Sequence, residues 1–499
     1  MSDPVSETTS ETVSETTSET VSETTSETVS ETTSETVSET GGEVESASMA
    51  AATLLDRYRA RTPRSAALNA EAKRSMPGGD TRSTIWFAPY PPFVAEGAGA
   101  FVTDVDGNRY VDLLNNYTSL IHGHAHPVLA EAIGEQLGRG ASFAAPHESA
   151  MRLSEMLCER VASIERVRFT NSGTEAVMMA VRVARAFTGR PLIAKAEGGY
   201  HGTWDDVQLS VAPALDEAGS TEAPVAVPES PGLSPGAAAS TVVIPYNDLE
   251  GARAVLEPLA DRLAGVIVEP IQGAGGMIPA ESDYVEGLRA LATEIGALFV
   301  LDEVIAFRLA RGGAQSLFGI TPDLTTMGKF IGGGLAVGAF GGRADVMEVC
   351  DPSRPRAIPH YGTFNGNPAT MAGGVASLEL LTPRDYDRLN ALGDRLRDGI
   401  NDLAGELSLG FCATGIGSLL NIHLTEGPVR RYRDIVEAKR RAGPLHLALL
   451  NEGLFVAQRG LMSISTPMDE ALVDDMLERV RRAVLAAHAE ERFPELSVR

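Results

Sequence analysis

Cysteines, aromatic side chains and basic residues are all scarce in this 499-residue chain. The three cysteines, Cys158, Cys350 and Cys412, are too few and too scattered for a disulfide framework, which favours a reducing, cytoplasmic compartment. With 42 basic against 67 acidic side chains, the charge balance argues against a nucleic acid or an anionic membrane as the main partner. No apolar run reaches about 18 residues, so we expect no transmembrane helix. The N-terminus has neither a basic region nor an apolar core, so we expect no secretory signal.

The first 48 residues differ in composition from everything that follows. They hold 12 acidic and no basic side chains, which leaves 55 acidic and 42 basic for the other 451 residues. From Ser6 the unit Ser-Glu-Thr-Thr-Ser-Glu-Thr-Val repeats every eight residues. One valine per repeat cannot build a core, so residues 1–48 are predicted to be a disordered acidic tail. Met49 opens the first helical segment and is an alternative start of translation.

The central part of the chain alternates helical and strand patterns. Helical periodicity is found at 127–138, 148–162, 174–187, 249–261 and 283–295, and short strands are predicted at 166–170, 192–195, 266–269 and 298–302. Such alternation predicts an α/β fold with a parallel sheet covered on both faces. Residues 212–240 are rich in Pro, Ala, Gly, Ser and Glu and are predicted to form a surface loop.

Both ends of the body predict a second, smaller domain. Residues 50–75 are helical with a break at Pro63, and 92–113 resemble short strands with a turn at Asp106-Gly107. Further helices are predicted at 366–381, 385–404 and 468–490, with strands within 409–424 and 453–466. The predicted division is therefore a tail (1–48), a first segment of the small domain (49–115), a large domain (116–365) and the rest of the small domain (366–499).

Two motifs at strand ends suit a phosphorylated, planar ligand. Asn171-Ser172-Gly173-Thr174 follows a strand and opens a helix, where backbone N–H groups and hydroxyls can bind phosphate. An ordinary N-capped helix start is the alternative. Tyr200 and His201 stand between Gly199 and Gly202 after the next strand, where a tyrosine can lie on a planar ring. A tyrosine packed on the surface is the alternative there.

Two charged residues follow later strands. Asp302 ends the apolar strand 298–302 and would need a cationic partner if buried. A metal is less suited than a protonated heterocycle, because no His or Cys stands nearby at ligand spacing. Lys329 lies among small and apolar residues before three glycines, which favours a nucleophilic amine over a surface lysine. Together the four motifs provide what a pyridoxal phosphate site requires.

These motifs resemble the class III aminotransferases, of the fold type I pyridoxal phosphate family. Further matching segments are Asp104–Asp112, Gly123-His124-Ala125-His126-Pro127, Val268-Glu269-Pro270 and Gly362–Pro368. The stretch Met76–Arg82 is similar to glutamate-1-semialdehyde aminomutases and β-amino acid aminotransferases. The segments Phe87–Tyr90, Arg308-Leu309-Ala310 and Gln458-Arg459-Gly460 resemble β-phenylalanine aminotransferases more closely. The resemblance implies a mostly parallel seven-stranded sheet between helices, plus a smaller α/β domain built from both chain ends.

The resemblance also implies roles for individual residues. Lys329 would hold the cofactor as a Schiff base, Asp302 would pair with the pyridine nitrogen, and Tyr200 and Val304 would pack on opposite ring faces. The other implied cofactor contacts are His201, Glu269, Gln272, the phosphate ligands Ser172, Gly173 and Thr174, and Thr363 from the neighbouring subunit of a homodimer. The implied substrate contacts are Arg82 for the carboxylate, Arg459 for a second carboxylate or the side chain, and Phe87 and Tyr90 as an apolar wall.

The expected reaction is transfer of the amino group of a β-amino acid to a keto acid such as 2-oxoglutarate. Two arginines suit two carboxylates, because a guanidinium binds a carboxylate bidentately. The alternatives are glutamate-1-semialdehyde 2,1-aminomutase and a broader ω-amino acid or amine transaminase. A catalytically inactive scaffold is disfavoured, because Lys329 and Asp302 are both present.

Overall fold

The computed structural model describes residues 53–491, so the predicted acidic tail lies outside the described residues. The body begins with two helices, α2 (Leu54–Arg61) and α3 (Pro63–Ala72). Thr53 caps α2 through its hydroxyl, which accepts from the Asp56 N–H. Pro63 begins α3, where its missing N–H leaves no helical bond unmade. The predicted break at Pro63 is therefore confirmed.

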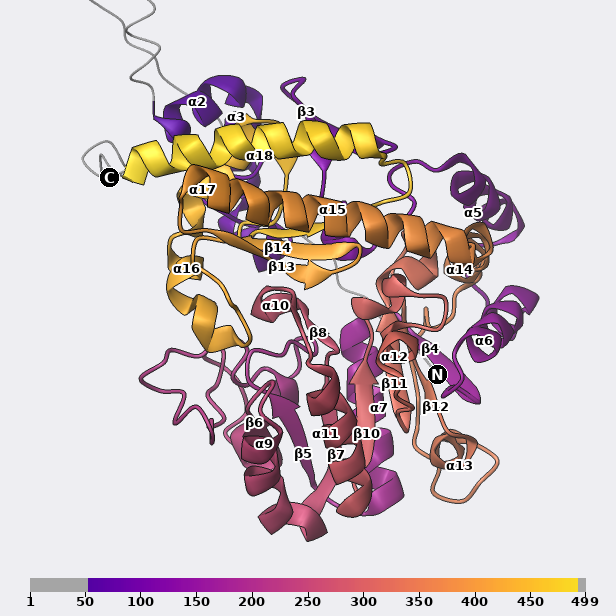
Figure 1. Cartoon of the computed structure of the whole chain (residues 1–499). Coiled ribbons are helices and arrows are strands. Elements are labelled where there is room, and N and C mark those ends of the chain that lie inside the picture. Colours follow the sequence, from indigo (N-terminus) through magenta and orange to yellow (C-terminus); the bar gives the residue numbers. More distant parts are fainter. Residues whose placement is uncertain (1–52, 492–499) are drawn as a thin grey trace, which may run out of the picture. The chain divides into compact units, whose positions relative to one another are not determined.

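A seven-stranded sheet lies within the predicted large domain (Figure 1). Its order is β4 (Arg166–Thr170), β12 (Gly338–Gly342), β11 (Leu324–Gly328), β10 (Leu298–Asp302), β7 (Leu263–Val268), β5 (Leu192–Ala196), β6 (Thr241–Ile244). Only β12 runs antiparallel to its neighbours. The mostly parallel sheet expected from the sequence is thus confirmed.

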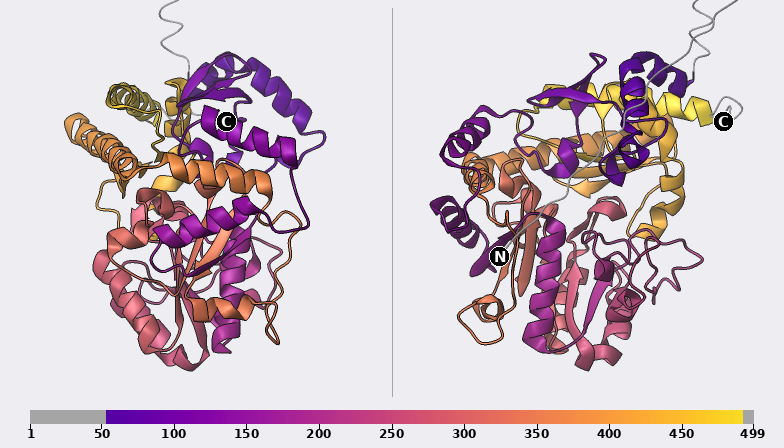
Figure 2. Two further views of the ribbon diagram at one scale, coloured as in Figure 1. Left: turned by 90° about the vertical axis from the view of Figure 1, so that its right-hand side faces the viewer. Right: turned by 180° about the vertical axis from the view of Figure 1, so that it is seen from behind.

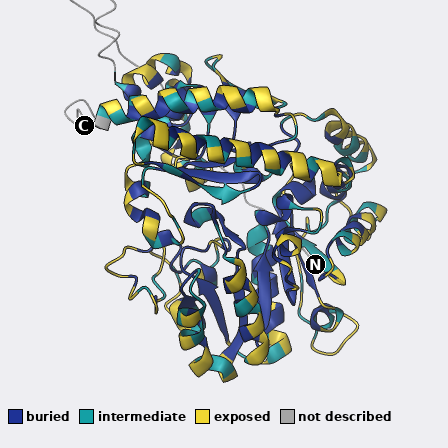
Figure 3. Ribbon diagram, in the orientation of Figure 1, coloured by how far each residue is buried: buried dark blue, intermediate teal, exposed yellow. Residues whose placement is uncertain are grey.

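The two faces of the sheet carry different helices. Along β10, Leu298 and Val300 pack in one apolar cluster with α7 (Gly173–Thr188). The alternate residues Phe299 and Leu301 pack in another with α11 (Ser282–Glu294). Side chains that alternate across a strand bury both faces, so the sheet is enclosed while the outer helix surfaces stay exposed (Figure 3).

Two smaller sheets bring the chain ends together. One is β1 (Val94–Ala98), β2 (Phe101–Asp104), β3 (Arg109–Asp112) and β15 (Leu454–Phe455), with β15 parallel to β3. The other is β13 (Cys412–Ile416), β14 (Leu419–His423) and β16 (Leu461–Ser463). The helices α15 (Pro383–Leu407) and α18 (Glu470–Glu491) lie side by side over them (Figure 1, Figure 2). The predicted domain boundaries themselves stay predictions.

The remaining elements connect these layers. They are α4 (Asn115–Thr118), α5 (Pro127–Arg139), α6 (Glu148–Arg160), α8 (Ala237–Ser240), α9 (Leu249–Leu256), α10 (Gly273–Gly276), α12 (Ala314–Phe318), α13 (Ala344–Met347), α14 (Pro368–Leu380), α16 (Val436–Arg440), α17 (Ala442–Asn451), β8 (Ile271–Gln272) and β9 (Ile278–Pro279). The helix predicted at 249–261 is shorter, because Pro258 interrupts it and residues 257–262 form a 3₁₀ turn. Apart from α8, residues 212–240 form the predicted loop. Across residues 53–491, no helix is both long and apolar enough to cross a membrane.

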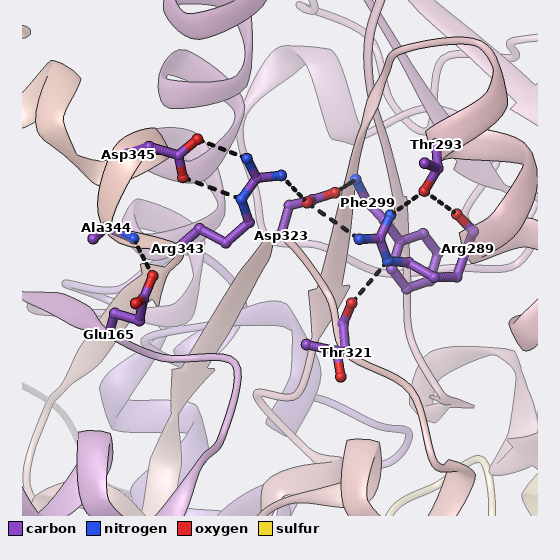
Figure 4. Close-up of polar contacts among 9 residues, drawn as sticks. All are labelled: Glu165, Arg289, Thr293, Phe299, Thr321, Asp323, Arg343, Ala344 and Asp345. Atoms are coloured by element: carbon purple, nitrogen blue, oxygen red, sulfur yellow. Dashed lines mark hydrogen bonds and ion pairs between the residues drawn. The ribbon is translucent and has the colours of Figure 1, made fainter.

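Asp323, just before β11, ties the amino-terminal ends of the central strands together (Figure 4). Its side chain is 3% exposed and accepts from Arg343 Nη1 (2.7 Å), Arg289 Nη2 (3.3 Å) and the Phe299 N–H (2.8 Å). Two guanidinium groups and one backbone donor offset the cost of burying this carboxylate. The opposite, carboxyl ends of the same strands carry the residues described next.

Candidate active site

Asp302 is a buried carboxylate with three hydrogen-bond donors. Its Oδ1 accepts from Thr326 Oγ1 (2.9 Å) and from the Val304 N–H (3.1 Å), and its Oδ2 accepts from His201 Nδ1 (2.8 Å). Burial lowers the pKa of His201, so we assign a neutral ring that donates its Nδ1–H. The donors fix the orientation of the Asp302 carboxyl within the site.

Lys329 follows β11, the strand beside β10, and lies with Asp302 on one cavity. Burial lowers the pKa of its amine from 10.5 to about 8, although the carboxylates of Asp302 and Glu269 act in the opposite direction. Its backbone has a φ of 56°, in the left-handed region that a lysine rarely adopts. The amine is therefore partly neutral near physiological pH and suited to attack a carbonyl carbon.

The N-terminus of α7 forms one wall of the same cavity through Gly173 and Thr174. Ser172 caps the helix, and its Oγ accepts from the Glu175 N–H at 3.2 Å. Gly173 is needed for close approach, because a Cβ there would lie 3.0 Å from both γ-carbons of Val304. The helix cap and a phosphate-binding site are therefore compatible, because Ser172 Oγ accepts a hydrogen bond in the cap and its hydroxyl proton remains free to donate to a phosphate.

Glu269 and Tyr200 form another wall. The Glu269 carboxyl accepts from the Tyr200 N–H (2.9 Å) and the Gly273 N–H (3.1 Å). Burial, followed by the nearby Asp302, raises the pKa of Glu269 to about 8. The Tyr200 side chain is only partly buried, so its ring is available to a ligand in the cavity.

The donor set fits pyridoxal phosphate. An amine of lowered pKa suits the aldehyde, a fixed buried carboxylate suits a protonated pyridine nitrogen, and a capped helix N-terminus suits a phosphate. Val304 and Tyr200 supply apolar surface in the same cavity. Within residues 53–491, no three His, Cys, Asp or Glu side chains gather as a metal site would require.

The two predicted substrate arginines lie near one tyrosine that the sequence analysis did not single out. The guanidinium carbon of Arg82 is 5.9 Å, and that of Arg459 is 5.4 Å, from the centre of the Tyr117 ring. Arg82 also donates through Nη2 to Asn116 Oδ1 at 2.8 Å. Arg459 is close enough to Glu269 and Tyr200 for electrostatic interaction, and burial lowers its pKa. Its Nε has no hydrogen-bond partner among the described residues.

A second cavity, of about 410 Å³, lies beside Arg82. Its lining includes Arg82 and Tyr117 and is otherwise largely apolar, with Ile85, Trp86, Phe87, Val102 and Phe455 among its members. The Phe87 ring packs edge-on against His446, with centroids 4.5 Å apart, and so is held in place. This cavity can accept an apolar group attached to a carboxylate.

Five predicted site residues do not line either cavity: Ser172 and Arg459, described above, and Tyr90, Gln272 and Thr363. The Tyr90 hydroxyl lies 3.1 Å from Thr62 Oγ1 and its ring packs on Tyr58. Gln272 donates to the Glu197 carbonyl (2.7 Å), and its other side-chain atom, Oε1, has no partner among the described residues. Thr363 is exposed to solvent.

Sequence reasoning missed Thr326, Asn116 and Tyr117. Thr326 stands three residues before Lys329, and the parallel pairing of β10 with β11 places it beside Asp302. The Asn115-Asn116 pair is a signal for left-handed backbone, but nothing local relates it to Arg82.

The chain is similar to known proteins in its sequence and its structure. The family model for Aminotransferase class-III matches residues 86–483. Glutamate-1-semialdehyde 2,1-aminomutase 2 of Brevibacillus brevis is 42% identical over 399 residues, 79% of this chain and 91% of that protein. Beta-phenylalanine transaminase of Variovorax paradoxus is 41% identical over 403 residues, 80% of this chain and 88% of that protein. The crystal structure of an omega-transaminase from Sphaerobacter thermophilus is 44% identical, with a TM-score of 0.82, covering 85% of this chain and 98% of that one.

Proposed function

The chain belongs to the class-III aminotransferases, and from this premise we propose that it transfers the amino group of a β-amino acid, with an aryl or alkyl side chain, to a keto acid such as 2-oxoglutarate. The observation that carries the proposal is the placement of Arg82 on a largely apolar cavity. Through Tyr117 and Arg459 it is linked to Glu269, which lines the cavity that holds Lys329 and Asp302. Membership of the family implies pyridoxal phosphate as the cofactor.

Pyridoxal phosphate, when bound, supplies an electron sink for the carbon that carries the amine. In our proposal Lys329 would hold the cofactor covalently, and its amine would move a proton at that carbon. Its pKa of about 8 suits an acid–base group that works near neutral pH. Asp302, held by Thr326, Val304 and His201, keeps the pyridine nitrogen protonated. Ser172, Gly173 and Thr174 bind the phosphate.

For the substrate, we propose that Arg82 binds the carboxylate and that the apolar cavity takes the side chain. A β-amino acid carries its side chain on the carbon that bears the amine, one carbon away from the α-carbon. Phe87 and Trp86 provide flat apolar surface for an aryl group in this cavity. Arg459 would bind the second carboxylate of the acceptor keto acid, because its Nε still lacks a partner among residues 53–491.

We further propose that the active unit is a cytoplasmic homodimer with shared sites. Thr363 is exposed and lines neither cavity, which suits a residue that reaches the neighbouring subunit. Tyr361 and Phe364 beside it are 88% and 59% exposed, and apolar side chains this open to water favour burial against a second copy. Sedimentation at micromolar concentration tests this assembly, and a monomer with full activity would contradict it.

The experiment that tests the function is a half-reaction. The cofactor-loaded protein is mixed with β-phenylalanine and no acceptor, and the visible absorption of the bound cofactor is followed. We expect conversion to the aminated cofactor and its reversal by 2-oxoglutarate. Arg82→Ala should raise the KM for β-phenylalanine at least tenfold, whereas Arg384→Ala, at an exposed arginine on α15 that lines neither cavity, should not.

The aminomutase relative makes a second assay necessary, because it is as similar as the transaminase. Glutamate-1-semialdehyde is therefore supplied without any acceptor. Turnover of this compound, together with no response to β-amino acids, would replace the proposal with the aminomutase reaction. Conversion of simple amines that lack a carboxylate, at the same rate as β-phenylalanine, would instead favour a broad amine transaminase.

A further inference from the structure

Residues Asn115–Thr118 form a left-handed turn of four consecutive non-glycine residues. Their φ angles are 47°, 47°, 56° and 73°. L-amino acids enter this region as single residues, at an energetic cost, and asparagine tolerates it best among side chains with a Cβ. A run of four therefore persists only where the surrounding structure imposes it.

The surrounding structure holds the turn at both ends. Asp112 Oδ1 accepts from the N–H groups of Leu114 and Asn115, both at 2.8 Å. The Asn115 side chain donates to the Ser463 carbonyl of β16 at 2.8 Å. At the other end, the fully buried Arg308 donates from Nη1 to the Thr118 carbonyl at 3.2 Å. Asn115 and Thr118 are buried, so the ends of the turn are fixed and its middle faces outward.

The middle of the turn faces the segment that carries Arg82. Asn116 is exposed, and its Oδ1 accepts the 2.8 Å hydrogen bond from Arg82 Nη2. The Tyr117 hydroxyl donates to the Thr84 carbonyl, two residues along from Arg82. The Tyr117 ring also contacts the Arg82 guanidinium, at 5.9 Å from its centre. Two of these contacts bind the Arg82 side chain, and the third holds the backbone two residues along from it.

We propose that Asn116 is a positioning residue that presets the Arg82 guanidinium for a substrate carboxylate, with the left-handed turn as its rigid support. The inference rests on the proposed function, in which Arg82 binds the substrate carboxylate. An exposed arginine has many rotamers, and ordering it before the substrate arrives removes that entropy cost from binding. The remaining guanidinium N–H groups stay available to the carboxylate.

The chemistry of residue 116 explains why an amide suits this role. The amide oxygen accepts from Arg82 without carrying charge, so the guanidinium keeps its full attraction for the substrate. An aspartate has nearly the same shape, but it would form an ion pair with Arg82 and compete with the substrate carboxylate. A glycine would keep the left-handed backbone and lose the hydrogen bond.

The test measures binding of 3-phenylpropanoate, a carboxylate without an amine, to the cofactor-loaded protein by calorimetry. The proteins are wild type, Asn116→Gly, Asn116→Asp, Arg82→Ala and the two double variants. We expect Kd to rise about 5-fold in Asn116→Gly, the loss of one hydrogen bond at an exposed site, and at least 10-fold in Asn116→Asp. In the Arg82→Ala background neither substitution should change Kd, because Asn116 acts through Arg82. With β-phenylalanine, Asn116→Gly should raise KM and leave kcat within 2-fold.

Each contrary result has a distinct meaning. Unchanged binding in Asn116→Gly, or a full effect of position 116 in the Arg82→Ala background, would overturn the positioning role. A wild-type protein that does not bind the probe would overturn it too. Wild-type binding of the probe without conversion of β-phenylalanine would reject the proposed function and leave the positioning role standing. Thermal unfolding of every variant shows whether the turn has remained folded.

Discussion

The titration of Lys329 provides the sharpest test of the site. Burial lowers the pKa of its amine from 10.5 to about 8. At pH 7 an amine with a pKa of 8 is about 9% neutral, against roughly 0.03% at a pKa of 10.5, a difference of about 300-fold. Asp302 is the largest charge that opposes this shift, so Asp302→Asn should lower the pKa of Lys329 further.

Competitive trace labelling measures this titration directly. The cofactor-free protein is acetylated with a trace of acetic anhydride between pH 6 and 11, and each lysine peptide is quantified by mass spectrometry. The exposed Lys73 on the surface serves as the internal reference. We expect the labelling of Lys329 to reach half of its plateau near pH 8 in the wild type and at a lower pH in Asp302→Asn. Limited access of the reagent changes the plateau and leaves the midpoint unaffected.

A midpoint at pH 10 or above would refute the reasoning, because it would mean that water or the neighbouring carboxylates fully compensate the burial of the amine. A midpoint that does not move in Asp302→Asn would refute the electrostatic part alone.

Three further predictions follow from packing and charge. The pKa of Lys329 is about 8 in the folded protein and 10.5 in the unfolded chain, so the cofactor-free protein gains stability as pH rises between these values. In urea titration at pH 7, Lys329→Met should therefore be about 2–3 kcal/mol more stable than wild type, and this advantage should be lost by pH 10.5. A stability difference that stays constant with pH would contradict this prediction. Asp323→Asn should lower the free energy of unfolding by about 3 kcal/mol, since it breaks a buried charge cluster (Figure 4), and a loss below 1 kcal/mol in urea titration would argue that the arginines re-pair. In Gly338→Ala the new Cβ would lie 2.0 Å from the Ser172 carbonyl oxygen, so cofactor affinity measured by fluorescence titration should fall at least 100-fold. In the control Gly134→Ala the new Cβ has no atom within 4 Å, so this variant should bind the cofactor as the wild type does.

Much of the fold could be predicted because its signals are local. Short strand patterns of four or five residues identified β4, β5 and β10, and their alternation with helices predicted a sheet enclosed on both faces. The strand β12, Gly338–Gly342, was not predicted, because glycines disfavour strands. It exists because β4 and the Ser172 loop approach so closely that no side chain fits at Gly338.

The candidate site divides in the same way. Lys329, Asp302, Tyr200 and the Gly173-Thr174 turn could be placed on one cavity from the sequence, since each follows a strand and parallel strands end at a common edge. Side-chain direction could not be predicted. The sequence motifs predicted Tyr90 and Gln272 to be site residues, yet packing turns Tyr90 toward Thr62 and Gln272 toward the Glu197 carbonyl.

The sequence by itself determined the α/β architecture and the order of chemical groups along it, because periodicity, turn residues and strand ends are properties of neighbouring residues. Only the tertiary structure decided that Thr326 and His201 hold Asp302, and that a strained turn at Asn115–Thr118 faces Arg82. These contacts join residues 24, 101 and 34 positions apart. They depend on rotamers and backbone angles that the packed surroundings impose, and no local pattern encodes them.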